Sequence, residues 1–166
     1  MRTARLLATL AALGLAFFAA TASARSLRYP QTGDPAFLVE VPEDWTSRTD
    51  KGNCIVGSGD HALAFSLNIV TSTLPVDQIA TKALEIQKVS PTPNRETVSI
   101  AGYGGVAYSW TASKADTTVD ITLMIVRIDS THIAICSTAV AGASSPEVRK
   151  IANWFVQDLQ ISRPAP

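Results

Sequence analysis

Residues 117–140 carry the clearest pattern of hydrophobic positions in the chain, two β-branched runs separated by Asp129-Ser130. Alternating β-branched residues bounded by turn residues are typical of strands. Two apolar sets alternate along the first run, Val119, Ile121, Leu123 and Ile125 on one face and Thr122, Met124, Val126 and Ile128 on the other. A strand that is apolar on both faces needs cover on each side. The pattern therefore predicts a central antiparallel hairpin with elements packed on both faces of its sheet.

Other segments repeat this spacing on a smaller scale, and turn residues separate them. The predicted strands are 37–41, 53–56, 61–70, 96–100 and 106–112. Residues 25–35 show no such alternation and are expected to form an irregular lead-in. Trp45 closes a turn that begins at Pro42, and we expect its ring to plug the edge of the core rather than to bind a ligand.

Two segments change to helical spacing, 74–89 and 146–159. Thr73 and Ser145 are the expected N-caps, because hydroxyl side chains accept hydrogen bonds from the first free N–H groups of a helix. The apolar stripes recur three and four residues apart. They consist of Val76, Ile79, Ala80, Ala83 and Ile86 in the first helix, and of Val148, Ile151, Ala152, Phe155 and Leu159 in the second.

The resulting order is three strands, a helix, four strands and a helix. This order predicts an α+β fold in which an antiparallel sheet of about six to seven strands carries two main helices on its faces. Neither an internal repeat nor a linker divides the segment that follows residue 24, so residues 25–166 are expected to form a single domain.

The first 24 residues have the features of a signal peptide. Arg2 and Arg5 precede an uncharged apolar stretch, and Ala22-Ser23-Ala24 matches the small-residue cleavage pattern. We expect cleavage after Ala24 and a periplasmic or secreted product without a membrane span. The absence of a cysteine at the cleavage site excludes a lipid anchor there. Retention as an anchor is the alternative, although the apolar stretch is short for a span of about 20 residues.

Charge narrows the choice of partners for the expected mature chain. It contains 12 basic and 14 acidic side chains, because the whole chain has 14 of each and the first 24 residues hold only Arg2 and Arg5. Nucleic acids and anionic membranes attract clustered lysine and arginine, and no such run is present. Another envelope protein is the expected partner.

Cys54 and Cys136 are the only cysteines. A lone pair in an exported protein commonly forms a disulfide, so a Cys54–Cys136 bond is expected. The alternative is two unpaired thiols buried as small hydrophobic groups.

Candidate catalytic residues are few. Ser58, Asp60 and His61 lie close together in sequence, but they follow the pattern of a hairpin turn and lack the spacing of a nucleophile elbow. His132 is expected at the exposed start of a strand. A thiol nucleophile formed by Cys136 and a histidine would compete with the disulfide. No catalytic residue is therefore assigned.

Cofactor and metal sites are not expected either. Gly104-Gly105 leads into a strand, whereas a phosphate-binding loop leads into a helix. The two histidines and Asp60 show no short-range spacing of metal ligands. The carboxylates Asp116, Asp120 and Asp129 flank strands or turns and are interpreted as a solvated edge.

Three features together resemble the PsbP-like fold family, which includes exported bacterial DcrB-like proteins. They are the strand that ends in Val41-Pro42-Glu43-Asp44-Trp45, the turn at Ile100-Ala101-Gly102, and the long hairpin followed by an amphipathic helix. The resemblance covers roughly residues 36–161. It implies an antiparallel sheet covered by helices, and a binding or accessory role in complexes more often than catalysis. It carries over no functional residue.

The leading hypothesis is an exported, non-catalytic accessory or protein-binding domain of the bacterial cell envelope. The loops expected to contact a partner are 43–52, 57–61, 90–95 and 113–118. The alternative is a small-ligand-binding protein or hydrolase of the periplasm, which would need a pocket that joins a histidine to a carboxylate or thiol. A purely structural envelope component is a third possibility.

Overall fold

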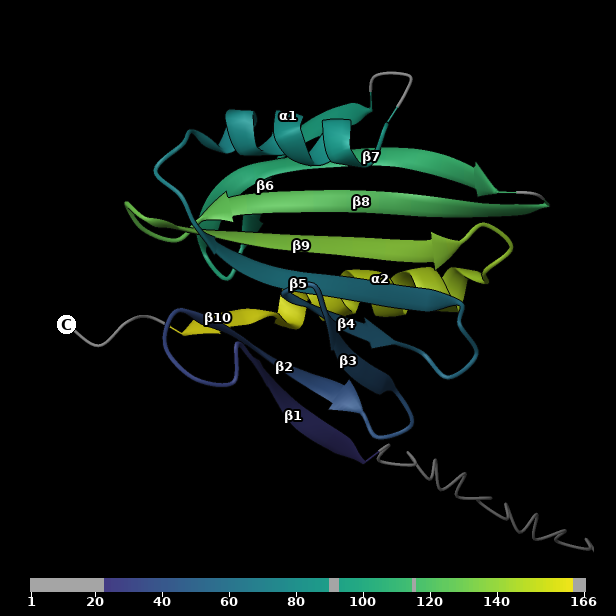
Figure 1. The fold of residues 1–166 in the computed structure, drawn as a ribbon. Helices are drawn as coiled ribbons and strands as arrows, with labels where there is room; N and C mark the ends of the chain where they lie inside the picture. The colour runs from purple at the N-terminus through teal and green to yellow at the C-terminus, as the bar shows by residue number, and fades with distance from the viewer. Residues whose placement is uncertain (1–22, 90–92, 115, 163–166) are drawn as a thin grey trace, which may run out of the picture.

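The computed structural model describes residues 23–89, 93–114 and 116–162 (Figure 1). Its elements, in chain order, are β1 (Ala24–Tyr29), β2 (Ala36–Pro42), β3 (Thr46–Asp50), β4 (Asn53–Gly57), β5 (Leu63–Thr71), α1 (Val76–Ile86), β6 (Asn94–Ile100), β7 (Tyr103–Lys114), β8 (Thr117–Arg127), β9 (His132–Ala141), α2 (Pro146–Asp158) and β10 (Gln160–Ser162).

A seven-stranded antiparallel sheet forms the middle layer, with the strand order β3-β4-β5-β9-β8-β7-β6. The β8–β9 hairpin lies at its centre, and its register runs from Val119 opposite Ala141 to Arg127 opposite Ile133. The predicted α+β fold is confirmed in its strand number, its antiparallel pairing and its two helices.

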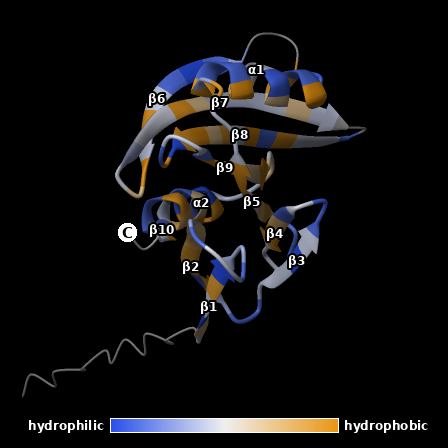
Figure 2. Ribbon diagram, turned by 60° about the vertical axis from the view of Figure 1, so that its left-hand side comes forward, coloured by the Kyte–Doolittle hydropathy of each residue, from blue (hydrophilic) through white to orange (hydrophobic). Residues whose placement is uncertain are grey.

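Helix α1 covers one face of this sheet, and the first hydrophobic core lies beneath it. The fully buried Ala80 faces one of the two predicted apolar faces of the central hairpin, which contributes Leu123, Ile125 and Ile133. Figure 2 shows α1 on one side of the sheet and α2 on the other. The expectation that both faces of β8 are covered is therefore confirmed.

The second core lies on the opposite face, under a third layer made by α2 and a small sheet. That sheet has the order β1-β2-β10. Phe37 and Val41 from β2 and Phe155 from α2 are fully buried against β4 and β5. Together α2 and the small sheet cover the middle of the seven-stranded sheet, and concave surfaces remain along the borders of this layer.

Strands β1, β3 and β10 were not predicted. The expectation of an irregular lead-in over 25–35 is wrong in its first part, because β1 pairs with β2 along its whole length. Strand β3 consists of exposed polar residues, coloured blue to white in Figure 2, and is formed by its pairing with β4. Strand β10 has only three residues. Each of these strands lies at a sheet edge, where an apolar pattern is not required.

The helix boundaries correct three expectations. Helix α1 begins after Pro75 without a side-chain cap, so the proposed cap at Thr73 is wrong. Ile86 is 81% exposed, because it is the last residue of α1 and lies beyond the core. The Ser145 cap of α2 is confirmed by its hydrogen bond from Val148 N. Ile151, however, is 40% exposed and lies at the edge of the buried stripe.

The predicted signal peptide falls almost entirely on residues 1–22, which lie outside the described residues. Ala24, the predicted last residue before cleavage, begins β1 and pairs with Pro42. Cleavage after Ala24 and a single domain over 25–166 stay predictions. Neither α1 nor α2 has the length and apolar composition that crossing a bilayer requires, and these are the helices in the described part of the chain.

Candidate functional site

Three stacked aromatic rings tie α2 to the sheet. The ring of Trp45 lies 5.8 Å from that of Phe65 and 6.2 Å from that of Phe155, while the rings of Phe65 and Phe155 lie 3.6 Å apart. Trp45 reaches this position through a tight turn closed by its N–H, which donates to Pro42 O at 3.1 Å. Trp45 is 8% exposed. Its predicted role as a plug at the core edge is confirmed.

A concave surface lies beside this cluster, which we call the α2 hollow. It has a volume of about 230 Å³ and is lined by Asp44, Trp45, Ser58, Gly59, Asp60, Leu63, Val148 and Ile151. Two of the predicted contact loops, 43–52 and 57–61, therefore meet here against α2. The other two, 90–95 and 113–118, lie partly outside the described residues, and their described parts do not contribute to this lining.

The α2 hollow has a negative rim. Asp44 and Asp60 line it, and the described lining residues include no lysine or arginine. Hydrogen bonds from the Ser58 hydroxyl and from the Ala62 N–H hold the pKa of the Asp60 carboxyl below its usual range. Asp60 therefore stays negatively charged at neutral pH.

An exposed apolar pair adjoins the α2 hollow on the outer side of α2. Ile151 is 40% exposed and Trp154 is 48% exposed. Their positions three residues apart place them next to each other on one side of the helix. Trp154 therefore lies at the surface of α2 and not in the core.

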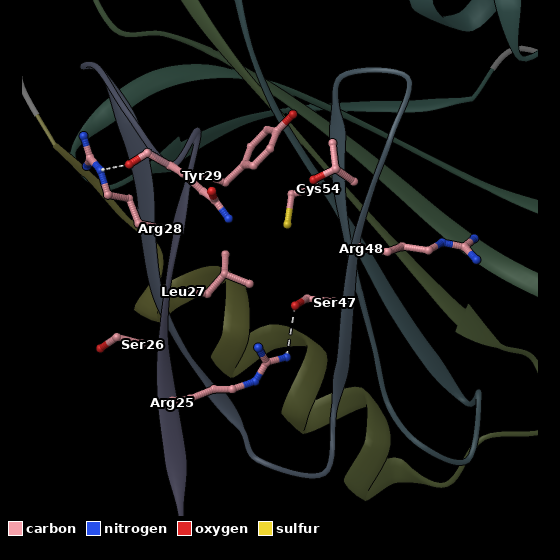
Figure 3. A pocket seen from close by; sticks show the side chains of 10 residues that line it. Arg25, Ser26, Leu27, Arg28, Tyr29, Ser47, Arg48 and Cys54 are labelled. Atoms are coloured by element: carbon pink, nitrogen blue, oxygen red, sulfur yellow. Dashed lines mark hydrogen bonds between the residues drawn. The ribbon is translucent and has the colours of Figure 1, made fainter.

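A second concave surface, which we call the Arg25 groove, lies between β1 and the β3–β4 hairpin (Figure 3). Its volume is about 400 Å³, and it is lined by Arg25, Ser26, Leu27, Arg28, Tyr29, Gln31, Ser47, Arg48, Thr49 and Cys54. Both β1 and β3 are edge strands, so the groove is an open border between the third layer and the middle layer.

The three arginines of this groove differ in orientation. Arg25 reaches from β1 toward β3, and its Nη2 donates to Trp45 O at 2.9 Å and to Ser47 Oγ at 3.1 Å. Arg28 turns away to Asp34, with an Nη2 to Oδ1 distance of 2.9 Å. Figure 3 shows the Arg48 side chain pointing away from the groove. Arg25 therefore supplies the positive charge that faces the groove.

Cys54 and Tyr29 add no charge to the groove at neutral pH. Burial raises the pKa of the Cys54 thiol, and the nearby Arg25 opposes that shift only in part. Burial also raises the pKa of the Tyr29 phenol, with a further contribution from Cys54. Both groups therefore stay protonated, and neither supplies a negative charge to Arg25.

The structure does not show the expected disulfide, and Cys54 and Cys136 are both free. Cys54 pairs with Leu67 on β5, and Leu67 pairs in turn with Cys136 on β9. Two strand spacings separate the cysteine Cα atoms by about 9.5 Å. A disulfide needs less than about 7 Å. An intervening strand thus keeps the two thiols apart.

We expect the purified protein to contain two free thiols. Alkylation in denaturant without reductant should add two groups per chain, whereas in the native state Cys136 should react slowly, because it is fully buried and its pKa is raised to about 12. Mass spectrometry of the intact protein measures both values. A chain that takes up no alkylating group until it is reduced would contradict the register of β4, β5 and β9.

The residues Ser58, Asp60 and His61 form a hairpin turn, as expected. The Ser58 hydroxyl donates to Asp60 Oδ1 at 2.6 Å and accepts from Leu63 N at 3.1 Å. The contact of His61 with this turn is made by its backbone N–H, which donates to Ser58 O at 3.0 Å. The described contacts thus stabilise the loop and do not join the imidazole to the hydroxyl.

His132 lies at the start of β9, and its Nδ1 is 2.8 Å from Asp129 Oδ2. Hydrogen bonds from the Thr131 N–H and from His132 lower the pKa of Asp129 strongly, so this carboxylate organises the β8–β9 turn. His132 pairs with Thr71 at the end of β5, whereas His61 precedes the start of β5. A nine-residue strand therefore separates the histidines by about 30 Å.

The remaining candidates are the carboxylates Asp120 and Asp116, which lie on β8 and just before it. Asp120 accepts hydrogen bonds from Thr111 and Arg149, which lower its pKa. Asp116 is exposed and lies between β7 and β8. Among the residues that the structure describes, no group of three or more histidine, cysteine or acidic side chains is arranged to hold a metal ion.

Comparison with solved structures shows that the chain has the PsbP-like fold. PsbP (CyanoP) from Synechocystis matches with a TM-score of 0.56 and 11% identity over 90% of this chain and 99% of its own. LpqN, involved in cell envelope biogenesis of Mycobacterium tuberculosis, matches with a TM-score of 0.51 and 12% identity over 84% of this chain and 91% of its own.

A crystal structure from Bacteroides thetaiotaomicron also matches, with a TM-score of 0.56 and 16% identity over 76% of this chain. This chain spans 45% of the length of that protein. No protein-family model matches the sequence, and no curated protein matches it either. At these identities the likeness concerns the fold, and the predicted resemblance to PsbP-like proteins is confirmed at that level.

Proposed function

We propose that this chain is an exported, non-catalytic accessory domain of the bacterial cell envelope that binds another envelope protein. The exposed pair Ile151 and Trp154 beside the α2 hollow is the observation that carries the proposal. Interface centres are rich in aromatic anchors, and the concave surfaces beside them receive side chains of the partner. The fold that the chain shares with LpqN, an envelope-biogenesis protein, and the predicted signal peptide support the location.

The α2 hollow favours a partner segment that combines an apolar side chain with a neighbouring basic residue. Its volume of about 230 Å³ is below the 300–1,000 Å³ that small-molecule pockets typically have. Trp45 and Leu63 supply apolar walls, and the carboxylates of Asp44 and Asp60 favour a cation at the rim. Neither His61 nor His132 lines the α2 hollow or the Arg25 groove, so these two surfaces give no support to the alternative of a histidine-dependent hydrolase.

Photo-crosslinking in the native envelope tests the proposal. A photoreactive phenylalanine derivative placed at position 151 or 154 should give a reproducible adduct with one envelope protein. Position 86 is the matched control, because Ile86 is an exposed apolar residue at the end of the other helix. We expect no adduct from position 86, and we expect Asp44→Asn to reduce the yield from position 154.

Two outcomes would contradict this function. The first is the absence of protein adducts from positions 151 and 154, and the second is the same adduct pattern from position 86. If the adduct yield does not change in the Asp44→Asn variant, the proposed docking surface still stands. The requirement for a basic residue in the partner would then be wrong.

A further inference from the structure

The Arg25 groove is separate from the α2 hollow and has different chemistry. Its lining residues come from β1, from the segment just after β1, and from the β3–β4 hairpin, and it shares no lining residue with the α2 hollow. Its volume of about 400 Å³ lies within the range of small-ligand sites. Charge and shape together indicate what this groove can hold.

One end of the groove carries a guanidinium whose hydrogen-bonding capacity is only partly used. Both described hydrogen bonds of the Arg25 side chain come from Nη2, to Trp45 O and Ser47 Oγ. These acceptors are neutral, so they hold the side chain in place without cancelling its charge. The described contacts leave Nε and Nη1 for an external acceptor, and each of them can donate a charge-assisted hydrogen bond to a carboxylate oxygen.

The other charged groups near the groove restrict the ligand to a monoanion. Arg28 is neutralised by Asp34, which also accepts a hydrogen bond from Ser162. Arg48 points away from the groove, as Figure 3 shows. The described lining residues include no aspartate or glutamate that would repel an anion. Among the described side chains, Arg25 is the one cation that faces the groove, so a monoanionic carboxylate is a better match than a phosphate dianion.

The middle of the groove suits a short apolar chain. Leu27 projects between Arg25 and Tyr29, and Cys54 faces it from β4 in Figure 3. Tyr29 lies four positions after Arg25 on β1, which corresponds to about 13 Å along the strand. The serine and threonine hydroxyls of β3, from Ser47 and Thr49, line the opposite wall.

We propose that the Arg25 groove binds a small organic carboxylate, with the guanidinium of Arg25 holding the carboxylate and Leu27 and Cys54 contacting an apolar chain that extends toward Tyr29. The inference extends beyond the proposed function, because it concerns a different surface and a small molecule. Failure of either proposal leaves the other intact.

Titration of the ¹⁵N-labelled protein, produced from the full-length gene, with octanoate tests the inference by amide chemical shifts. We expect saturable shifts at Leu27, Tyr29, Ser47 and Cys54. 1-Octanol, which has the same chain without the charge, should bind at least about tenfold more weakly, the loss expected for one charge-assisted hydrogen bond. Inorganic phosphate should produce no saturable shifts at these residues.

Two arginine variants locate the interaction. Arg25→Gln should weaken octanoate binding at least about tenfold. Arg48→Gln removes the same charge from the rim, but its side chain points away, so affinity should change by less than about twofold. Amide dispersion of each variant reports whether it is folded.

Three results would overturn the inference. They are the absence of saturable octanoate shifts in the unmodified protein, equal affinity for octanoate and 1-octanol, and tighter binding of phosphate than of octanoate. None of the three depends on a variant, so the test remains decisive even if Arg25→Gln fails to fold. Equal loss of affinity in Arg25→Gln and Arg48→Gln would also overturn the assignment of Arg25.

Discussion

Phe155→Ala is expected to lower the free energy of unfolding by about 3–5 kcal/mol, the usual cost of removing a buried aromatic ring. Phe155 is fully buried, and its ring stacks on those of Phe65 and Trp45. The ring joins α2 to the middle sheet, so its removal leaves a cavity at the contact between two layers. Urea unfolding followed by circular dichroism measures the change.

Trp154→Ala provides the matched control on the same helix. Trp154 is the preceding residue and is also aromatic, but it is 48% exposed. Substitutions of surface residues typically change stability by no more than about 0.5 kcal/mol. A cost for Trp154→Ala equal to that of Phe155→Ala would mean that α2 packs in a different rotation. Such a rotation would also remove the apolar pair on which the proposed function depends.

The central part of the fold could be predicted because its apolar residues recur at the regular spacing of a strand or a helix. Strand β8 has apolar residues on both faces, and the structure places Leu123 in one core and Met124 in the other. Burial on both faces requires a continuous apolar run, so the sequence shows it directly. The α2 stripe was equally clear, and Ala152, Phe155 and Leu159 are all buried.

The edge strands could not be predicted because their stability comes from pairing rather than from their own side chains. Strand β3, with the sequence TSRTD, exposes all five residues and is held by β4. Strand β1 is six residues long, and only two of its side chains, Leu27 and Tyr29, pack against the core. Polar, short edges also protect a sheet from unwanted pairing, so a weak hydrophobic signal is expected there.

The same reasoning explains which surface could be predicted. Loops 43–52 and 57–61 have clear turn residues, and the α2 hollow lies between them. One wall of the Arg25 groove was partly indicated, because the predicted contact loop 43–52 supplies Ser47, Arg48 and Thr49. The other wall was missed because β1 is an edge strand without a strand pattern, and Arg25 was assigned to an irregular segment.

The cysteines show a different limit of sequence reasoning. Their number and the predicted export favoured a disulfide, and each lies on a predicted strand. Whether two strands are neighbours depends on the long-range order of the sheet. Leu67 lies between the two cysteines because β5 pairs with both β4 and β9, an order that neither local pattern specifies.

Gly105→Ala is expected to cost at least about 3 kcal/mol, at the upper end of the range for inserting an atom into a packed interior. A Cβ at Gly105 would lie 2.0 Å from Ile125 O and 2.8 Å from Val126 Cα. Both atoms belong to the backbone of β8, which cannot move away without separating from β7. The glycine is therefore required by the close approach of two strands. Urea unfolding, or the soluble yield if the variant does not fold, measures the loss.

Gly104→Ala is the matched control in the same strand. A Cβ at Gly104 would have no atom within 4 Å, and its φ is not in the left-handed region. Alanine restricts the unfolded chain more than glycine does, so we expect unchanged stability or a gain of up to about 1 kcal/mol. Equal effects at positions 104 and 105 would contradict the pairing of Gly105 with Val126. Because that pairing sets the register between β7 and the central hairpin, the comparison tests the arrangement of the middle sheet on which both candidate surfaces depend.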